Sequence, residues 1–177
     1  MKINVLLLLL YITTGVVSAQ GNNSKVEERN KIAGLRKQLL GKPLTDFSFT
    51  DVDGNKLNKK ELEGKVIVIN FWYTSCGPCI SEMPLLNDLV DSFKGKDVVF
   101  LAPALDTKER ISKFLQKHQF NYQIFPEQDS YAEKLKLEYF PTHIITDRKG
   151  IIRQVKIGYD ERVKDILTTA INELLKK

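Results

Sequence analysis

The sequence predicts an α/β fold in which helices flank a central mixed β-sheet, with a β-hairpin added on the N-terminal side. The run "VIVINF" at Val66–Phe71 contains almost no polar residue, which is typical of a strand covered on both faces. Segments with strand-like and helix-like periodicity then alternate along the chain, as they do in layered α/β proteins. A final hairpin pattern, His143–Thr146 and Ile151–Lys156 around "DRKG", adds antiparallel strands and makes the sheet mixed.

The first residues have the composition of a secretory signal peptide. Lys2 supplies a basic start, Val5–Val17 is almost wholly apolar, and small residues lead up to Ala19. We therefore expect residues 1–19 to be a signal peptide that is cleaved after Ala19. A retained membrane anchor is less favoured, because the apolar run is shorter than the ~20 residues that span a bilayer. The segment predicts export to the periplasm or another extracytoplasmic compartment, where exposed thiol pairs tend to be oxidised.

Residues 20–40 are expected to form a polar spacer and a short helix. Val26–Leu40 has apolar residues at helical spacing, and Gly41 and Pro43 end that pattern. The next segment, Phe47–Leu57, has the pattern of the added hairpin, with its turn at Asp53–Gly54.

Residues 41–177 are expected to form one domain, which is long enough to bury a core without disulfide bonds. The strand Val66–Phe71 is followed by a helix predicted over Cys79–Phe93, with a kink at Pro84 because proline cannot donate a hydrogen bond to the carbonyl of Ile80. Besides the closing hairpin, two further strands are predicted, Val98–Ala102 and Tyr122–Phe125. Three further helices are predicted, Lys108–His118, Ser130–Leu137 and Glu161–Leu175.

The charge pattern argues against a nucleic-acid partner. The formal net charge of +5 is modest, and basic residues are interleaved with acids in stretches such as "TKERISKFLQKHQ". Nucleic-acid binding needs a concentrated basic footprint, which this sequence lacks. We expect these residues to form the solvated surface of a monomer.

The chain has only two cysteines, Cys76 and Cys79, which are separated by Gly77 and Pro78. Cys76 lies between a predicted strand and a predicted helix, where unpaired N–H groups and the helix dipole favour a thiolate. Gly77 allows a tight turn that leaves the first sulfur exposed, and Pro78 suits a first helical turn. Cys79 is then less accessible, so that one sulfur can attack a disulfide and the other can resolve the adduct.

Other uses of the two sulfurs are less favoured. A purely structural disulfide would close a very short loop and would therefore stabilise the chain little. Zinc needs four ligands, and His118 and His143 lie far apart without paired ligand spacing. Covalent haem is excluded, because Ile80 stands where that motif needs histidine. A copper-binding or metallochaperone module is the main alternative, since thiolates are soft ligands.

The stretch "VINFWYTSCGPCISEMP" resembles the active site of thioredoxin-fold proteins, most closely that of the exported TlpA/ResA-like branch. "GKPLTDFSFTDVDGNKL" and "LEGKVIVINFW" resemble the N-terminal hairpin and first central strand of that branch, and "YFPTHIITDRKGII" resembles the segment that carries its cis-proline. The resemblance implies a thioredoxin fold without a cofactor or a metal. It also implies exchange with protein disulfides, such as those of cytochrome precursors. An upstream membrane dithiol donor is then expected to reduce the cysteine pair again.

The resemblance also implies a set of substrate-binding residues. Pro141 matches the cis-proline that faces the cysteine pair, and Phe140 occupies a position that shapes substrate fit. Trp72 matches an aromatic residue that shelters the site, although plain core packing is an alternative. Gly77 and Pro78 complete the expected substrate-binding surface beside the sulfurs.

The sequence departs from the thioredoxin pattern at one acid. Asn70 stands where thioredoxin has a buried acid that helps to move protons to the second cysteine. We expect Glu82 to replace it, because Glu82 is three residues past Cys79 on the same helix face. The alternative is a first-turn acid that only interacts with the helix dipole. Peroxidase chemistry is not expected, because Ile69 and Tyr73 replace the proline and threonine of peroxiredoxins.

The sequence thus predicts an exported thiol–disulfide oxidoreductase. Cys76 is the expected nucleophile, Cys79 the resolving thiol and Glu82 the group that assists proton transfer. The Gly-Pro dipeptide resembles that of reducing thioredoxins, so a reductase is expected. A non-catalytic interaction domain that keeps the fold is a further alternative.

Overall fold

The computed structural model describes residues 23–176, so the signal peptide expected at residues 1–19 lies outside the described residues. The chain divides into two units, residues 1–38 and residues 39–177. Residues 23–39 form a helix, which confirms the element predicted over 26–40. Among the described residues, no helix combines the length and the hydropathy that a membrane span requires.

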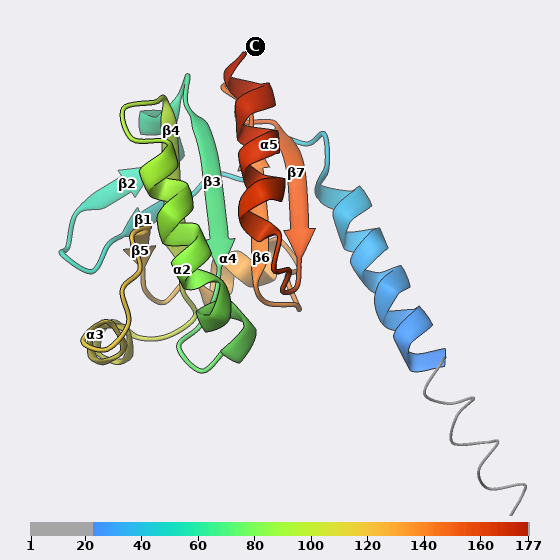
Figure 1. The fold of residues 1–177 in the computed structure, drawn as a ribbon, viewed down its shortest axis with the longest axis horizontal. Coiled ribbons are helices and arrows are strands. Elements are labelled where there is room, and N and C mark those ends of the chain that lie inside the picture. The colour runs from blue at the N-terminus through green and yellow to red at the C-terminus, as the bar shows by residue number, and fades with distance from the viewer. Residues whose placement is uncertain (1–22, 177) are drawn as a thin grey trace, which may run out of the picture. The chain divides into compact units, whose positions relative to one another are not determined.

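The second unit is built on a five-stranded mixed sheet with the order β5-β4-β3-β6-β7 (Figure 1). The central strand β3 pairs in parallel with β4 and antiparallel with β6. The edge strands continue these directions, since β5 is parallel to β4 and β7 is antiparallel to β6. The strand bounds are Val66–Phe71 for β3, Val98–Pro103 for β4, Gln123–Phe125 for β5, Thr142–Thr146 for β6 and Ile152–Ile157 for β7.

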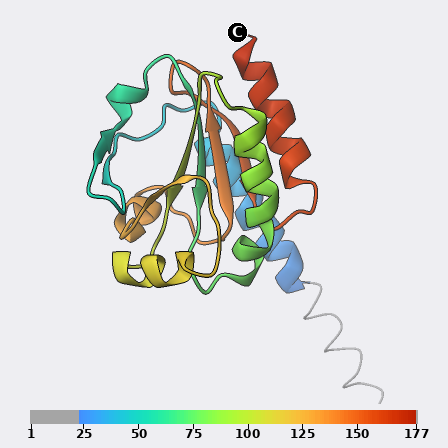
Figure 2. The ribbon, with the colours of Figure 1, turned by 60° about the vertical axis from the view of Figure 1, so that its left-hand side comes forward.

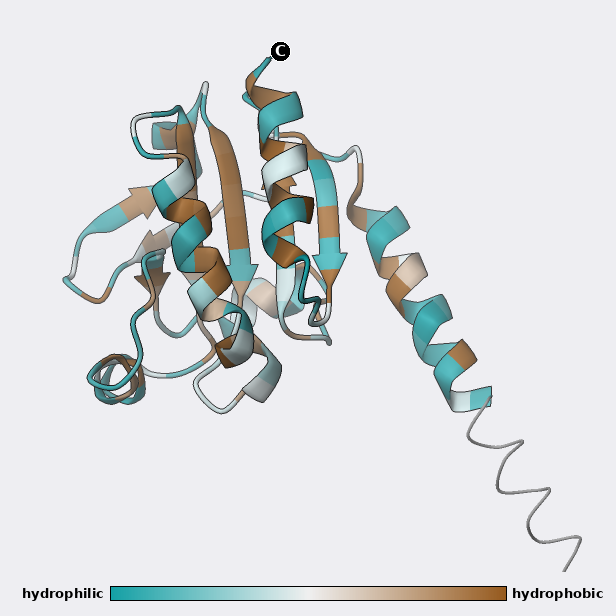
Figure 3. Cartoon of the chain, in the orientation of Figure 1, coloured by the Kyte–Doolittle hydropathy of each residue, from teal (hydrophilic) through white to brown (hydrophobic). Residues whose placement is uncertain are grey.

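Helices α2 (Gly77–Ser92) and α5 (Val163–Leu175) cover one face of this sheet, and α4 (Asp129–Lys134) lies on the other (Figure 2). Helix α3 (Lys108–Leu115) follows β4. Every residue of β3 is buried, and Figure 3 shows that most of this strand is hydrophobic. The apolar cluster between the sheet and α2 and α5 includes Val66, Val68, Met83, Leu86, Leu89, Val163, Leu167 and Ile171. The mixed sheet with flanking helices is therefore confirmed.

The added N-terminal hairpin is also present. Strands β1 (Ser48–Thr50) and β2 (Lys56–Asn58) form a separate antiparallel sheet, followed by the short 3₁₀ helix η1 (Lys59–Leu62). The Phe49 ring lies 5.2 Å from the ring of Phe125 and 5.0 Å from that of Tyr131. The hairpin thus contributes aromatic packing to the sheet face opposite α2.

The main difference from the predicted elements is the start of α2. This helix begins at Gly77 rather than Cys79, and Cys76 is its N-cap. Proline is favoured in a first helical turn, because its missing N–H would have no partner there. Pro78 therefore lies inside α2, which continues through Pro84 to Ser92.

Candidate active site

The two cysteines form a disulfide bond at the junction between β3 and α2. The S–S distance is 1.96 Å and the Cα atoms are 5.3 Å apart. The backbone N–H of Cys79 donates a hydrogen bond to Cys76 Sγ at 3.2 Å. In the reduced protein this donor and the helix dipole would favour a thiolate at Cys76, which is the nucleophile of disulfide exchange.

The sulfurs are more buried than the sequence suggests. Cys76 is 3% exposed and Cys79 is fully buried. The expectation of an exposed first sulfur is therefore wrong for this oxidised form, because Cys76 turns inward to bond with Cys79. Cys76 is still the more accessible of the two.

Gly77 and Pro78 are exposed beside the disulfide. Gly77 is helical without a positive φ angle, and a Cβ atom there would meet nothing within 4 Å. The tight turn that we expected to require glycine is therefore absent. The missing side chain instead leaves the helix start open to an approaching molecule.

The Phe140–Pro141 peptide bond is cis, as the resemblance predicts. Pro141 is buried and Phe140 is half-buried, with its ring 5.6 Å from that of Tyr73 in the loop before Cys76. The carbonyl of Pro141 accepts a hydrogen bond from Gly158 N–H at 2.8 Å. The ring contact holds the start of β6 beside the loop after β3, and the hydrogen bond holds it beside the end of β7.

Trp72 is fully buried directly after β3. Its ring lies 5.3 Å from that of Phe114 and 5.5 Å from that of Phe120. Its Nε1 atom has no hydrogen-bond partner among the described residues. Trp72 therefore packs beneath the site, within the same apolar cluster as the cysteines.

Glu82 is fully buried and points into the protein. Its Oε2 atom lies 2.8 Å from His143 Nε2, and its Oε1 atom accepts a hydrogen bond from Asp160 N–H at 3.1 Å. The first turn of α2 contains no acid, so the alternative of a first-turn acid at the helix dipole is wrong. The carboxyl group is held by two contacts from outside its own helix.

His143 is the residue that the sequence analysis missed at this site. The sequence suggests His143 only as a zinc ligand without paired ligand spacing, yet the residue is fully buried against Glu82. The antiparallel register of β3 and β6 places His143 directly opposite Asn70. Its position two residues after Pro141, with the strand alternation of β6, is the signal that could have indicated this inward orientation.

Unpartnered polar atoms gather on the same sheet face. Among the described residues, neither the amide nitrogen nor the amide oxygen of Asn70 has a hydrogen-bond partner, and His143 Nδ1 has none either. Asn70 shares a face with Val68 and Trp72, two residues to either side, and both belong to the cluster beneath α2 and around Cys79. Burial, and then the negative charge of Glu82, raise the pKa of Tyr122 far above its ordinary value, so this phenol stays protonated.

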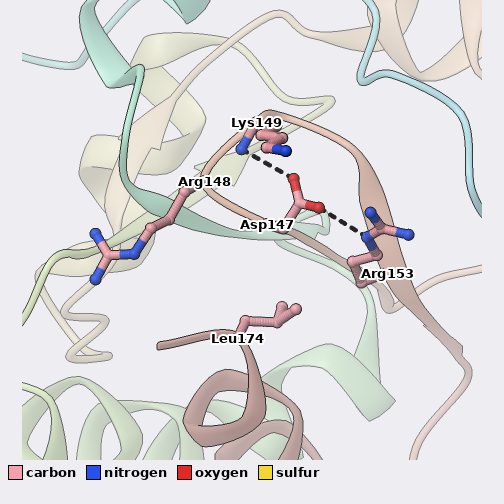
Figure 4. Close-up of a pocket in the computed structure, with 5 residues that line it drawn as sticks. All are labelled: Asp147, Arg148, Lys149, Arg153 and Leu174. Atoms are coloured by element: carbon pink, nitrogen blue, oxygen red, sulfur yellow. Dashed lines mark hydrogen bonds and ion pairs between the residues drawn. The ribbon is translucent and has the colours of Figure 1, made fainter. Parts of the chain in front are cut away.

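A charged hollow lies elsewhere in the fold. It has a volume of about 320 Å³ and is lined by the β6–β7 turn and Leu174 of α5 (Figure 4). This turn follows the end of β6 that is remote from Pro141. Among the described residues, no group of three or more His, Cys, Asp or Glu side chains converges as metal ligands.

Residues 40–155 match the AhpC/TSA family. The chain is 31% identical over 178 residues to the thiol-disulfide oxidoreductase ResA of Bacillus cereus, an alignment that covers 98% of this chain and 92% of that protein. It is 30% identical over 121 residues to ResA of Geobacillus kaustophilus, covering 67% of this chain and 70% of that protein.

Solved structures share the fold of this chain. The thioredoxin domain of a thiol-disulfide oxidoreductase from Bacteroides vulgatus has a TM-score of 0.67 at 20% identity, covering 75% of this chain and 98% of that one. A thiol-disulfide isomerase from Corynebacterium glutamicum also has a TM-score of 0.67, at 22% identity, covering 77% of this chain and 97% of that one. The predicted thioredoxin fold is thereby confirmed. The chain belongs to the AhpC/TSA family, in which it is a thioredoxin-like thiol–disulfide oxidoreductase similar to ResA.

Proposed function

We propose that this protein is a reductase that exchanges its Cys76–Cys79 pair with disulfides of exported proteins. The observation that carries the proposal is the pair itself, at a helix N-terminus with Cys79 N–H donating to Cys76 Sγ. That position favours a thiolate at the first cysteine, as a reducing nucleophile requires. The Gly-Pro dipeptide between the cysteines, which resembles that of reducing thioredoxins, supports the direction.

The reaction runs in two exchange steps. The Cys76 thiolate attacks a substrate disulfide, a mixed disulfide forms, and one substrate sulfur leaves as a thiolate. Cys79 then loses its proton to Glu82 and attacks Cys76 Sγ, which releases the second substrate sulfur. The substrate gains two electrons, and the two cysteines lose them as their own disulfide forms. An upstream membrane dithiol donor restores the reduced pair.

The surface around the pair supports a protein substrate. Gly77 and Pro78 are exposed, and the half-buried Phe140 lies close to Tyr73. We assign Gly77, Pro78, Phe140 and the backbone beside Pro141 to substrate contact, while Trp72 supports them from below. The protein acts as a monomer and needs no cofactor.

Export is part of this proposal. Residues 1–19 serve as a cleaved leader that delivers the domain to the periplasm or an equivalent compartment, as the short apolar run indicates. The mass of the protein recovered from that compartment should correspond to a chain that begins at Gln20. A mass that retains residues 1–19 would instead favour an anchor.

The function is tested by reduction of insulin disulfides with dithiothreitol as the electron donor. The wild-type protein should accelerate precipitation of the insulin chains, and the Cys76→Ser/Cys79→Ser double variant should not exceed the uncatalysed rate. Lys94→Ala, which changes an exposed side chain in the loop after α2, is the matched control and should retain full activity. Equal activity of the double variant would overturn the proposal. Titration of the reduced protein with Cu(I) tests the alternative, because tight stoichiometric binding without reductase activity would favour a copper module.

A further inference from the structure

The buried contact between Glu82 and His143 indicates that the proposed proton transfer depends on His143 as well as on the Glu82 carboxylate. We propose that His143 is a positioning residue: through its Nε2 atom it holds the Glu82 carboxylate in the orientation that accepts the proton of Cys79. Glu82 and His143 then act as one unit in the second exchange step. This inference rests on the proposed role of Glu82 and identifies what makes that role possible.

The geometry supports a specific arrangement of hydrogen bonds. His143 Nε2 lies 2.8 Å from Glu82 Oε2, so a proton on Nε2 makes the histidine a donor to the carboxylate. Asp160 N–H occupies the other carboxylate oxygen at 3.1 Å. The two donors come from β6 and from the loop after β7, and together they fix both oxygens of a side chain carried by α2.

A purely structural explanation fits these observations poorly. Both side chains are fully buried, and burying a carboxyl group and an imidazole costs free energy that their contact offsets only with good geometry. An apolar pair of similar volume often stabilises a protein as well or better. Moreover, His143 Nδ1 and both polar atoms of the Asn70 side chain are buried without a partner in the described part of the chain, although most buried polar groups in proteins have one. Such a concentration of polar groups beside a redox cysteine is typical of a site that moves a proton.

The positions of the residues explain how the unit serves Cys79. Glu82 lies three residues after Cys79 in α2, so the two side chains share a helix face. His143 reaches the same region from β6, opposite Asn70 in the central strand. When Cys79 attacks, its S–H bond breaks, an O–H bond forms on Glu82, and the sulfur electron pair forms the bond to Cys76 Sγ. The released substrate thiolate takes up a proton from water, and Glu82 later returns its proton to solvent.

Several other charged groups face this unit and must be included in any pH analysis. Lys156 of β7 lies opposite His143 in register, and its Nζ atom is 4.0 Å from Asp160 Oδ2. Arg162 also pairs with Asp160, at 3.4 Å. Tyr122 stays protonated and does not titrate in the neutral range. Among the described residues, His143 is the one whose side chain hydrogen-bonds to the Glu82 carboxylate.

The test compares two substitutions that differ in hydrogen bonding. His143→Leu removes the donor to Glu82, whereas His143→Gln places an amide N–H close to the position of Nε2 but cannot be protonated. His118→Leu and His118→Gln are the matched controls, since His118 is the other histidine of the chain and is exposed. Stopped-flow measurements from pH 5 to 9 follow the release of a mixed disulfide by Cys79, and alkylation of Cys76 by iodoacetamide follows the first sulfur separately.

We expect His143→Leu to slow mixed-disulfide release about 10- to 100-fold. A positioned proton-transfer group contributes ~10²–10⁴-fold to a rate, and the loss of its positioning residue should remove part of that factor. His143→Leu should also shift the pH profile of that release and leave the alkylation rate of Cys76 unchanged. His143→Gln should recover most of the rate, and the His118 variants should behave as wild type. Normal release by His143→Leu, or an equal loss in both steps with a lowered melting temperature, would overturn the inference.

The Glu82→Gln variant separates this inference from the proposed function. If Glu82→Gln is slow and His143→Leu is normal, the positioning role fails while the role of Glu82 stands. If Glu82→Gln is normal, the proton-transfer role of Glu82 itself fails. If the two residues act as one unit, the double variant Glu82→Gln/His143→Leu should be about as slow as either single variant, because their effects are not additive. Additive losses would overturn the coupling.

Discussion

The two cysteines differ in their environments although only Gly77 and Pro78 separate them. Cys76 is the N-cap of α2 and accepts the Cys79 N–H, while Cys79 is fully buried in the first helical turn. A thiolate is favoured at the first position by the helix N-terminus and disfavoured at the second by apolar burial. This asymmetry supports the proposed attack by Cys76 and resolution by Cys79.

The asymmetry predicts different behaviour of the two single cysteine variants. Cys79→Ser should accumulate mixed disulfides with substrate proteins, because the adduct on Cys76 cannot be resolved. Cys76→Ser should accumulate few, since its remaining thiol is buried and has no N-terminal donor. Non-reducing gels of extracts that express each variant measure the adducts. Adducts confined to Cys76→Ser would reverse the assignment.

At the scale of elements, the β6–β7 turn shows how hydrogen bonds shape a connection. Figure 4 shows that Asp147 Oδ1 accepts the backbone N–H of Lys149 at 2.9 Å and that Oδ2 accepts Arg153 Nε–H at 2.7 Å. Oδ1 also accepts the backbone N–H of Ile151 at 3.0 Å. Partial burial acts to raise the pKa of Asp147, but these hydrogen bonds outweigh it and hold the pKa below its usual range. The turn aligns β7 with β6, the strand that carries His143.

We predict that Asp147→Asn lowers the free energy of unfolding by about 1.5–3 kcal/mol at pH 7, the range for hydrogen bonds to a charged group. Because the pKa is lower in the folded state, the ionised carboxylate stabilises the fold above the unfolded pKa of about 4. That contribution disappears as the pH falls through the folded value. Urea unfolding at pH 7 and in steps below pH 4 should therefore show the difference from wild type shrinking.

The matched control for the turn is Lys149→Ala. Lys149 contributes its backbone N–H, and its side chain is exposed, so stability should change by less than about 0.5 kcal/mol. A difference between Asp147→Asn and wild type that does not depend on pH would contradict the assigned role of the carboxylate.

At the scale of the whole domain, one sheet separates two packed layers. The helical layer of α2 and α5 contains the cysteines and Glu82, and the opposite face is covered by α4 and aromatic residues of the β1–β2 hairpin (Figure 2). Helix α5 is remote from the cysteines in sequence, yet its apolar residues complete the cluster that contains them. Its contribution should therefore be to stability rather than to chemistry.

We predict that Leu167→Ala lowers the free energy of unfolding by about 2–5 kcal/mol, because Leu167 is fully buried and its truncation leaves a cavity. Thr169→Ala, an exposed position two residues further along α5, should change it by less than about 0.5 kcal/mol. Urea unfolding measures both variants. Insulin reduction per folded molecule should stay near the wild-type rate, and a large loss of that rate would show that α5 acts on the site directly.

Local sequence patterns were sufficient to predict the order of the elements and to identify Cys76 and Cys79 as a redox pair. The buried run of β3, the strand–helix alternation and the hairpin patterns are local periodicities, so each could be recognised without knowing its neighbours. The cysteine spacing and the cis bond before Pro141 were likewise predicted, the latter from a family resemblance. Element ends were less accurate, as at the start of α2, because capping depends on contacts of single residues.

The surroundings of Cys76, Glu82 and His143 became apparent only from the tertiary structure. Glu82 and His143 are 61 residues apart, and they meet because β6 pairs antiparallel with β3 in a register that turns His143 toward α2. The alternation within β6 is local, but the register that places His143 opposite Asn70 depends on how two distant segments align, and a shift of one residue would turn His143 to the other face. The burial of Cys76 and the inward orientation of Glu82 also follow from packing between layers, where the free energy of a side chain depends on neighbours that lie far away in the sequence.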